Sequence, residues 1–147
     1  MIIAVDFDGT IVTHEYPRIG KEIPFAIATL KKLQEDFQLQ LILWTVREGK
    51  ELEEAVEYCR NKGLEFYAVN SNYPEEKPEN REPRKLKADL FIDDRNLGGL
   101  PDWGVIYNMI ASGQHFNIES FFSPYNNNEF TNRGSGKKNG FLKSIFG

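Results

Sequence analysis

Residues 2–10 read IIAVDFDGT, an apolar run followed by two acidic residues and a glycine. A short apolar run that ends in an acidic residue is typical of a strand buried on both faces of a sheet. Asp6 and Asp8 are two residues apart, so their side chains point to the same side of an extended chain. Gly9 permits a sharp turn where the chain leaves the strand. The stretch therefore predicts a buried strand that ends in a pair of carboxylates.

Strands and helices are expected to alternate along the rest of the chain. Apolar runs predict further strands over residues 39–44, 66–70 and 89–93. Apolar side chains at helical spacing predict helices over residues 24–37, 49–62 and 101–111. This alternation predicts an α/β fold with a doubly wound, Rossmann-like, mostly parallel sheet and helices on both faces. The carboxyl ends of its strands would share one edge, which is where ligands bind in such sheets.

The composition limits the class of protein. The chain has 147 residues, of which 40% are hydrophobic and 27% are charged, and these values are typical of one ordinary globular domain. Cys59 is the one cysteine, which excludes an internal disulfide and disfavours a cysteine-based zinc site. No apolar run approaches the roughly 20 residues of a membrane-spanning helix, and the N-terminus lacks the basic residues of a signal peptide. We therefore expect a cytoplasmic protein with no membrane association.

The net charge of −4 is unevenly distributed. Residues 126–147 hold four basic side chains and one acidic side chain, and their Asn- and Gly-rich part predicts disorder. We therefore divide the chain into a domain over residues 1–125 and a flexible basic C-terminal tail over residues 126–147. The acidic domain is expected to be a poor general binder of nucleic acid, because affinity for phosphate backbones comes mainly from Lys and Arg.

Four carboxylates are predicted to meet at the carboxyl edge of the sheet. Asp6 and Asp8 end the first strand, and Asp93 and Asp94 end the fourth. Taken alone, each pair has a simpler interpretation as a turn cap or a solvated acidic turn. Together, their charges would repel one another in one crevice unless a cation joined them. Oxygen-only ligands favour Mg²⁺, so the pattern predicts a magnesium site.

Two further segments offer groups for an anion. Thr45 ends an apolar strand and Arg47 follows closely, and a hydroxyl with a guanidinium suits phosphate oxygens. Thr45 taken alone favours a helix N-cap, because Glu48 completes the spacing of a capping box. Lys85 precedes the fourth strand, where its ammonium could neutralise a carboxylate and a bound phosphate or lie in a solvated basic turn.

Taken in order, DFDGT, the strand that ends in Thr45, the lysine and the strand that ends in Asp93 and Asp94 resemble the four motifs of the haloacid dehalogenase superfamily. The resemblance runs from residue 2 to about residue 110. The stretches LILWTVREG and ADLFIDDRN are similar to those of small capless hydrolases of this superfamily. The resemblance implies a Mg²⁺-dependent phosphomonoester hydrolase that works through an aspartyl-phosphate.

The resemblance also implies a role for each acidic residue. Asp6 matches the nucleophile that attacks phosphorus and is bound to the metal. Asp8 matches the general acid/base, and its backbone carbonyl would also bind Mg²⁺. Asp93 matches the metal-binding acid of the fourth motif, and Asp94 would support the metal directly or through water.

The basic and hydroxyl residues are matched in the same way. Thr45 matches the hydroxyl that binds the transferred phosphoryl group, and we expect Arg47 to bind phosphate beside it. Lys85 is our choice for the lysine of the third motif, because the spacing Lys-x-x-Ala-Asp before the fourth strand fits best. Lys87 and Lys77 are its rivals.

Relatives in the superfamily that act on small metabolites carry a cap domain. The two gaps where a cap would be inserted are residues 9–23 and 71–84, and both are too short to fold alone. We therefore expect no cap domain and an open site, closed by residues 11–20, by residues 71–84, by a second copy of the chain or by a large substrate. The expected partner is a small phosphorylated substrate or the phosphorylated end of a larger molecule.

Other classes of protein share part of this pattern. A receiver-like signalling module also uses acids, a Thr and a Lys on a doubly wound sheet, but its adjacent acids come first and its acceptor lies on a central strand. Here the spaced pair comes first and the adjacent pair last, which disfavours a receiver. A phosphotransferase differs from a hydrolase only in its acceptor and stays an alternative. A silent binding protein is disfavoured, because both Asp6 and Asp8 are present.

Overall fold

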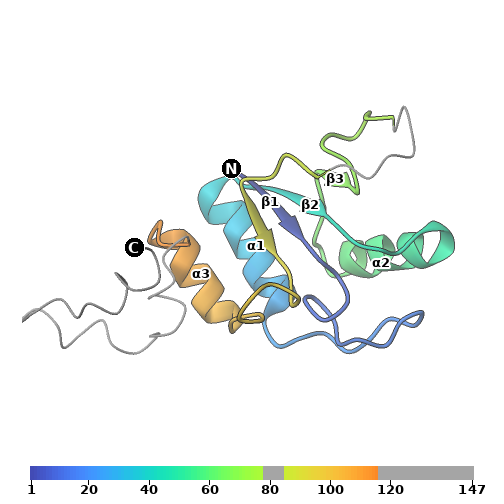
Figure 1. Ribbon diagram of the computed structural model, residues 1–147, viewed down its shortest axis with the longest axis horizontal. Coiled ribbons are helices and arrows are strands. Elements are labelled where there is room, and N and C mark those ends of the chain that lie inside the picture. The colour runs from blue at the N-terminus through green and yellow to red at the C-terminus, as the bar shows by residue number, and fades with distance from the viewer. Residues whose placement is uncertain (78–84, 116–147) are drawn as a thin grey trace, which may run out of the picture.

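The structure, a computed structural model, describes residues 1–77 and 85–115, and its centre is the parallel pair of β1 and β2 (Figure 1). The described strands are β1 (Ile2–Val5), β2 (Gln40–Leu43), β3 (Ala68–Val69) and β4 (Leu90–Ile92). The described helices are α1 (Ala26–Phe37), α2 (Gly49–Asn61) and α3 (Trp103–Ala111). Every predicted strand and helix is present, and the α/β class is confirmed.

The sheet has the order β3-β2-β1-β4, and all its neighbours are parallel. The chain moves outward from β1 to β2 and β3, and then returns to the other side of β1 for β4. The strand order therefore reverses between β1 and β4, which makes a topological switch point between these two strands. Val5 pairs with Ile92, and the Asp6 N–H donates to the Ile92 carbonyl at 3.0 Å. This register places Asp6 beside the end of β4.

The two faces of the sheet are covered differently. Side chains in register with Val5 face a core to which all three described helices contribute, through residues such as Leu30, Cys59 and Trp103. Ala4 and the side chains in register with it form a smaller cluster with Leu86 on the other face. Helices therefore cover one face within residues 1–77 and 85–115, whereas we expected them on both. Leu86 and Ala88, in the return from β3 to β4, pack on this second face.

Helices α1 and α3 lie side by side over this larger core, whereas α2 lies towards the β3 side of the sheet (Figure 1). The Tyr107 hydroxyl of α3 donates to Asp36 of α1 at 2.6 Å. Lys32 pairs with the same carboxylate at 2.8 Å. These contacts join the two helices at the end of α1 that is far from the carboxyl edge of the sheet.

Parts of the predicted organisation fall outside the described residues. They include the basic tail over residues 126–147, the last ten residues of the predicted domain and the second half of the 71–84 loop, residues 78–84. Among the described helices, none is long and apolar enough to span a bilayer.

Candidate active site

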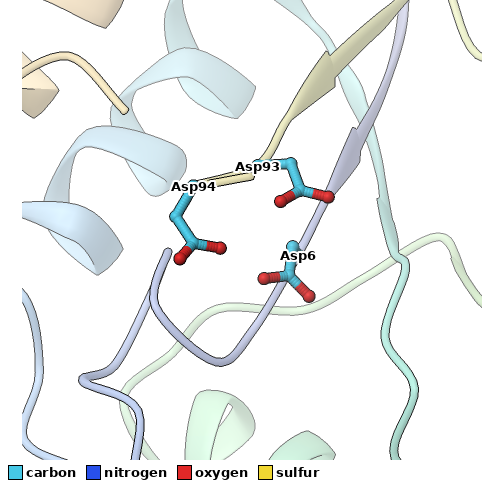
Figure 2. A group of neighbouring side chains, drawn as sticks. All are labelled: Asp6, Asp93 and Asp94. Atoms are coloured by element: carbon cyan, nitrogen blue, oxygen red, sulfur yellow. The ribbon is translucent and has the colours of Figure 1, made fainter. Parts of the chain in front are cut away.

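Three carboxylates meet at the switch point. Asp6 follows β1, and Asp93 and Asp94 follow β4, so the two neighbouring strands deliver them to one place. One oxygen from each lies within 4.8 Å of the other two, and all three residues are partly buried. Figure 2 shows the three carboxylates directed into a common space. The predicted meeting of Asp6 with Asp93 and Asp94 is confirmed.

Thr10 joins the two sides of this cluster. Its hydroxyl donates to Asp6 Oδ2 at 3.2 Å and accepts the Asp94 N–H at 3.1 Å. The residue is completely buried, and its carbonyl accepts the indole N–H of Trp103 at 3.3 Å. The sequence analysis gave Thr10 no role, although a hydroxyl in the turn after two carboxylates was a usable signal.

Gly9 lets the turn pass close to the cluster. Its φ of +92° lies in the left-handed region that favours glycine. A Cβ on this residue would overlap the Asp94 carboxylate and lie 2.7 Å from Cδ2 of His14. The close packing at Gly9 therefore helps to define the position of Asp94.

Gly9→Ala is expected to lower the free energy of unfolding by about 1–3 kcal/mol, because it combines a strained φ with a clash against Asp94. Because it displaces the Asp94 carboxylate, it should also weaken any rise in melting temperature on addition of Mg²⁺. Gly113→Ala is the matched control, because Gly113 has a φ of +70° but nothing within 4 Å of its added Cβ. Thermal unfolding with and without Mg²⁺ measures both effects, and equal Mg²⁺ responses in the two variants would contradict the role of Gly9.

Burial makes this cluster costly for negative charge. It raises the pKa of Asp6 from 3.8 to about 6, and the charges of Asp93 and Asp94 add to the rise. Hydrogen bonds from the Phe7 backbone and from Thr10 act in the opposite direction but are outweighed. Asp6 therefore binds a proton more readily than a free aspartate as the pH falls towards 6, and a cation would offset the cost of its charge at neutral pH.

The donor set fits a hard divalent cation. Asp94 Oδ1 is buried, and no donor from the described part of the chain reaches it. The other oxygen of Asp94 lies 3.6 Å from His14 Nε2. The His14 side chain is 46% exposed. Three carboxylates with a buried, unpaired oxygen among them match the ligands that Mg²⁺ and Ca²⁺ take in proteins. The residues that would hold the ion are Asp6, Asp93 and Asp94.

In metal-free protein, Asp6→Asn is expected to raise the free energy of unfolding at pH 7. A raised carboxyl pKa means that the folded state binds this proton more tightly than the unfolded state, whose pKa is near 3.8. Ionised Asp6 therefore destabilises the fold as the pH rises from about 4 to about 6, and Asn removes that charge. Urea unfolding of both proteins in EDTA should show the gain at pH 7 and its loss near pH 4. A variant that is less stable than the wild type at pH 7 would contradict this cause.

Asp8 lies outside the three-carboxylate cluster. Its carboxylate is buried and accepts two hydrogen bonds from Arg47, both at 2.7 Å, from Nε to Oδ2 and from Nη2 to Oδ1. The guanidinium also donates hydrogen bonds to the carbonyls of Pro17 and Arg18. Arg47 is completely buried and donates to groups of the protein, and its binding of phosphate stays a prediction. The Asp8 side chain is engaged by Arg47 and is not one of the clustered carboxylates, and metal binding by its backbone carbonyl stays a prediction.

Thr45 is oriented by hydrogen bonds from two directions. Its N–H donates to Asn70 Oδ1 at 2.8 Å, and its Oγ1 accepts the Arg47 N–H at 3.2 Å. The N-cap position of α2 is Glu48, so the interpretation of Thr45 as a helix cap is wrong. With a lone pair of Oγ1 taken by Arg47 and no acceptor for the hydroxyl hydrogen among residues 1–77 and 85–115, that hydrogen is available to an outside acceptor. Asn70 is a second residue that the sequence analysis missed, and its φ of +50° marks an unusual backbone position.

The lysine of the third motif is not identified by contacts in the structure. Lys85 is exposed, and its Nζ lies 5.6 Å from the centroid of the Phe91 ring. Within residues 1–77 and 85–115, no ion pair joins it to Asp6, Asp93 or Asp94. Lys87 and Lys77 are also exposed, so the choice among the three lysines stays a prediction.

The fold and the site define a parallel α/β protein with a carboxylate cluster at its topological switch point. The solved structure of a conserved protein from Bacteroides thetaiotaomicron is similar to this chain with a TM-score of 0.76. The two are 62% identical, and the match covers 84% of this chain and 98% of that one. The chain therefore belongs to the same family as that conserved protein. No model of a protein family and no curated protein matches the chain.

Proposed function

We propose that the protein is a Mg²⁺-dependent phosphomonoester hydrolase that forms an aspartyl-phosphate on Asp6. The observation that carries this proposal is the partly buried cluster of Asp6, Asp93 and Asp94 at the switch point of the sheet. Ligands bind at such points in open α/β sheets. Perturbed carboxyl pKa values also concentrate at catalytic sites, and the pKa of Asp6 is raised to about 6. The order of the sequence motifs supports the same chemistry.

The proposed reaction has two displacements. In the first, a carboxylate oxygen of Asp6 forms a bond to phosphorus, and the bond from phosphorus to the leaving oxygen breaks. Asp8, which first takes a proton from solvent on a lone pair that Arg47 does not occupy, gives that proton to the leaving oxygen. In the second, water attacks phosphorus, the bond to Asp6 breaks, and Asp8 takes the proton of the water. A covalent intermediate divides one difficult hydrolysis into two easier steps. Acid/base help of this kind contributes roughly 10²–10⁴-fold.

The remaining groups bind and neutralise the phosphoryl oxygens. Bound Mg²⁺ would supply positive charge that lets the anionic Asp6 and the anionic phosphate approach each other. The free hydroxyl hydrogen of Thr45 would donate to a phosphoryl oxygen, and Lys85 would add a positive charge. We propose a small phosphorylated molecule, or the phosphorylated end of a larger one, as the substrate in the cytoplasm.

The direct test is release of inorganic phosphate from p-nitrophenyl phosphate and from a panel of phosphorylated metabolites. We expect turnover with Mg²⁺ and its loss in EDTA, followed by recovery when excess Mg²⁺ is added back. Turnover that EDTA leaves unchanged would contradict the metal proposal.

The same assay separates the alternative functions. A receiver-like module would give a stoichiometric, long-lived aspartyl-phosphate without turnover. A phosphotransferase would transfer the group to an added alcohol in preference to water. Phosphate release at the rate of substrate loss supports the hydrolase.

A further inference from the structure

Arg47 is a buried cation at the carboxyl edge of the sheet. Its relative exposure is 0%, whereas arginine is almost never fully buried unless it is paired. Its partner is Asp8, and both hydrogen bonds of the fork are 2.7 Å long, which is typical of charge-assisted pairs. The pair joins two residues that are 39 positions apart in the sequence. Arg47 therefore determines where the Asp8 carboxylate lies.

The same guanidinium fixes the loop that follows the first motif. Its Nη1 donates to the Pro17 carbonyl at 2.9 Å, and its Nη2 donates to the Arg18 carbonyl at 2.8 Å. The rings of Phe7 and Tyr16 lie 5.1 and 5.2 Å from its Cζ. Four directed N–H bonds and two ring contacts thus hold one planar group, and they hold the 16–18 turn against Asp8.

This turn belongs to a segment that lies along the carboxylate cluster. Thr13 and Lys21 close the segment with two hydrogen bonds, from the Thr13 N–H to the Lys21 carbonyl and from the Lys21 N–H to Thr13 Oγ1. Between them, His14 reaches to within 3.6 Å of Asp94. Residues 13–21, which we call the rim segment, therefore contact Asp94 at one point and Arg47 at another.

The backbone of Arg47 acts on the site as well. Its N–H donates to Thr45 Oγ1, which leaves the Thr45 hydroxyl hydrogen for another acceptor. Arg47 thus contacts the proposed acid/base, the proposed phosphate-binding hydroxyl and the rim segment.

We propose that Arg47 is a positioning residue of the active site, which holds Asp8 against the rim segment and so in place for phosphoryl transfer at Asp6. This inference rests on the proposed function. Misplacement of a catalytic group by about 1 Å can cost 10²-fold in rate, so a fixed Asp8 matters more than its presence alone. Lysine cannot replace Arg47, because an ammonium on a flexible stem has no planar fork for four directed bonds.

The experiment compares Arg47→Lys, Arg47→Met, Asp8→Asn and the double variant Asp8→Asn/Arg47→Met in the p-nitrophenyl phosphate assay. Each protein is assayed below its own melting transition. We expect Arg47→Lys, which keeps the positive charge, to lose at least about 10-fold in kcat with KM nearly unchanged. The matched control is Arg60→Met, because Arg60 is exposed on α2 and pairs only with Glu57 among the described residues. Its kcat should equal that of the wild type.

The double variant tests whether Arg47 acts through Asp8. If it does, Asp8→Asn/Arg47→Met has the same kcat as Asp8→Asn, because no acid/base is left to position. A double variant whose loss in kcat equals the product of the two single losses would overturn the inference. A normal kcat in Arg47→Lys would overturn it as well. Should Arg47→Met fail to fold, Arg47→Lys alone and combined with Asp8→Asn gives the same comparison. These variant results bear only on the role of Arg47. A wild-type protein without turnover would instead overturn the proposed function.

Discussion

Asp6→Asn is expected to lose at least about 1000-fold in kcat for p-nitrophenyl phosphate in Mg²⁺. The amide of Asn is a poor nucleophile, and it replaces a carboxylate that lies within 4.8 Å of both Asp93 and Asp94. Among the described carboxylates at this edge of the sheet, none can take its place, because Asp8 is held by Arg47 and the other two follow a different strand. Steady-state release of p-nitrophenol measures the loss.

Asp36→Asn is the control for this loss. Asp36 is an aspartate of α1 that pairs with Lys32 and Tyr107, at the end of the helix away from the cluster. Its kcat should stay within a few-fold of the wild type. Near-normal activity in Asp6→Asn would show that Asp6 is not the nucleophile, and equal losses in both variants would point to a general effect on folding.

Arg47→Met is expected to lower the free energy of unfolding by about 3–5 kcal/mol at pH 7, because it leaves the buried Asp8 carboxylate without its counter-charge. It also removes the N–H donors of two carbonyls, those of Pro17 and Arg18. Urea unfolding measures the loss. Arg60→Met, which removes an exposed arginine, should change the same quantity by less than about 0.5 kcal/mol.

The unpaired charge of Asp8, given as the cause of the lost stability, leads to a second expectation for the Arg47 variants. Asp8→Asn/Arg47→Met removes both charges, so it should be more stable than Arg47→Met alone. A double variant that is as unstable as Arg47→Met would mean that the lost packing on Phe7 and Tyr16 dominates. Equal stabilities of Arg47→Met and Arg60→Met would contradict the structural importance of the pair.

Asp6 and Arg47 differ in how stability and function are related. At Asp6 the fold accepts an unfavourable charge, so its removal should stabilise the metal-free protein while activity disappears. At Arg47 the buried charge is matched by Asp8 and by backbone carbonyls, so its removal should damage both stability and activity. Active sites commonly contain residues that are needed for catalysis but lower the stability of the fold.

Local patterns in the sequence were sufficient for the elements and for part of the site. Apolar periodicity predicted β1, β4 and the helices between them, since it reflects which side chains a strand or helix can bury. The carboxylates after those strands could then be assigned to one edge, because parallel strands end together. The capping-box interpretation of Thr45 failed, because the helix begins at Gly49 and Thr45 instead accepts the Arg47 N–H.

The sequence by itself determined the α/β order of elements and the strand ends that carry Asp6, Asp93 and Asp94, because both depend on residues close together in the chain. The tertiary structure alone decided that Arg47 turns inward to Asp8 and that Thr10 connects Asp6 with Asp94. It also decided that the described helices cover one face of the sheet. These features depend on which distant groups become neighbours once the core has packed, and a charged side chain such as Arg47 is buried only when those neighbours satisfy it.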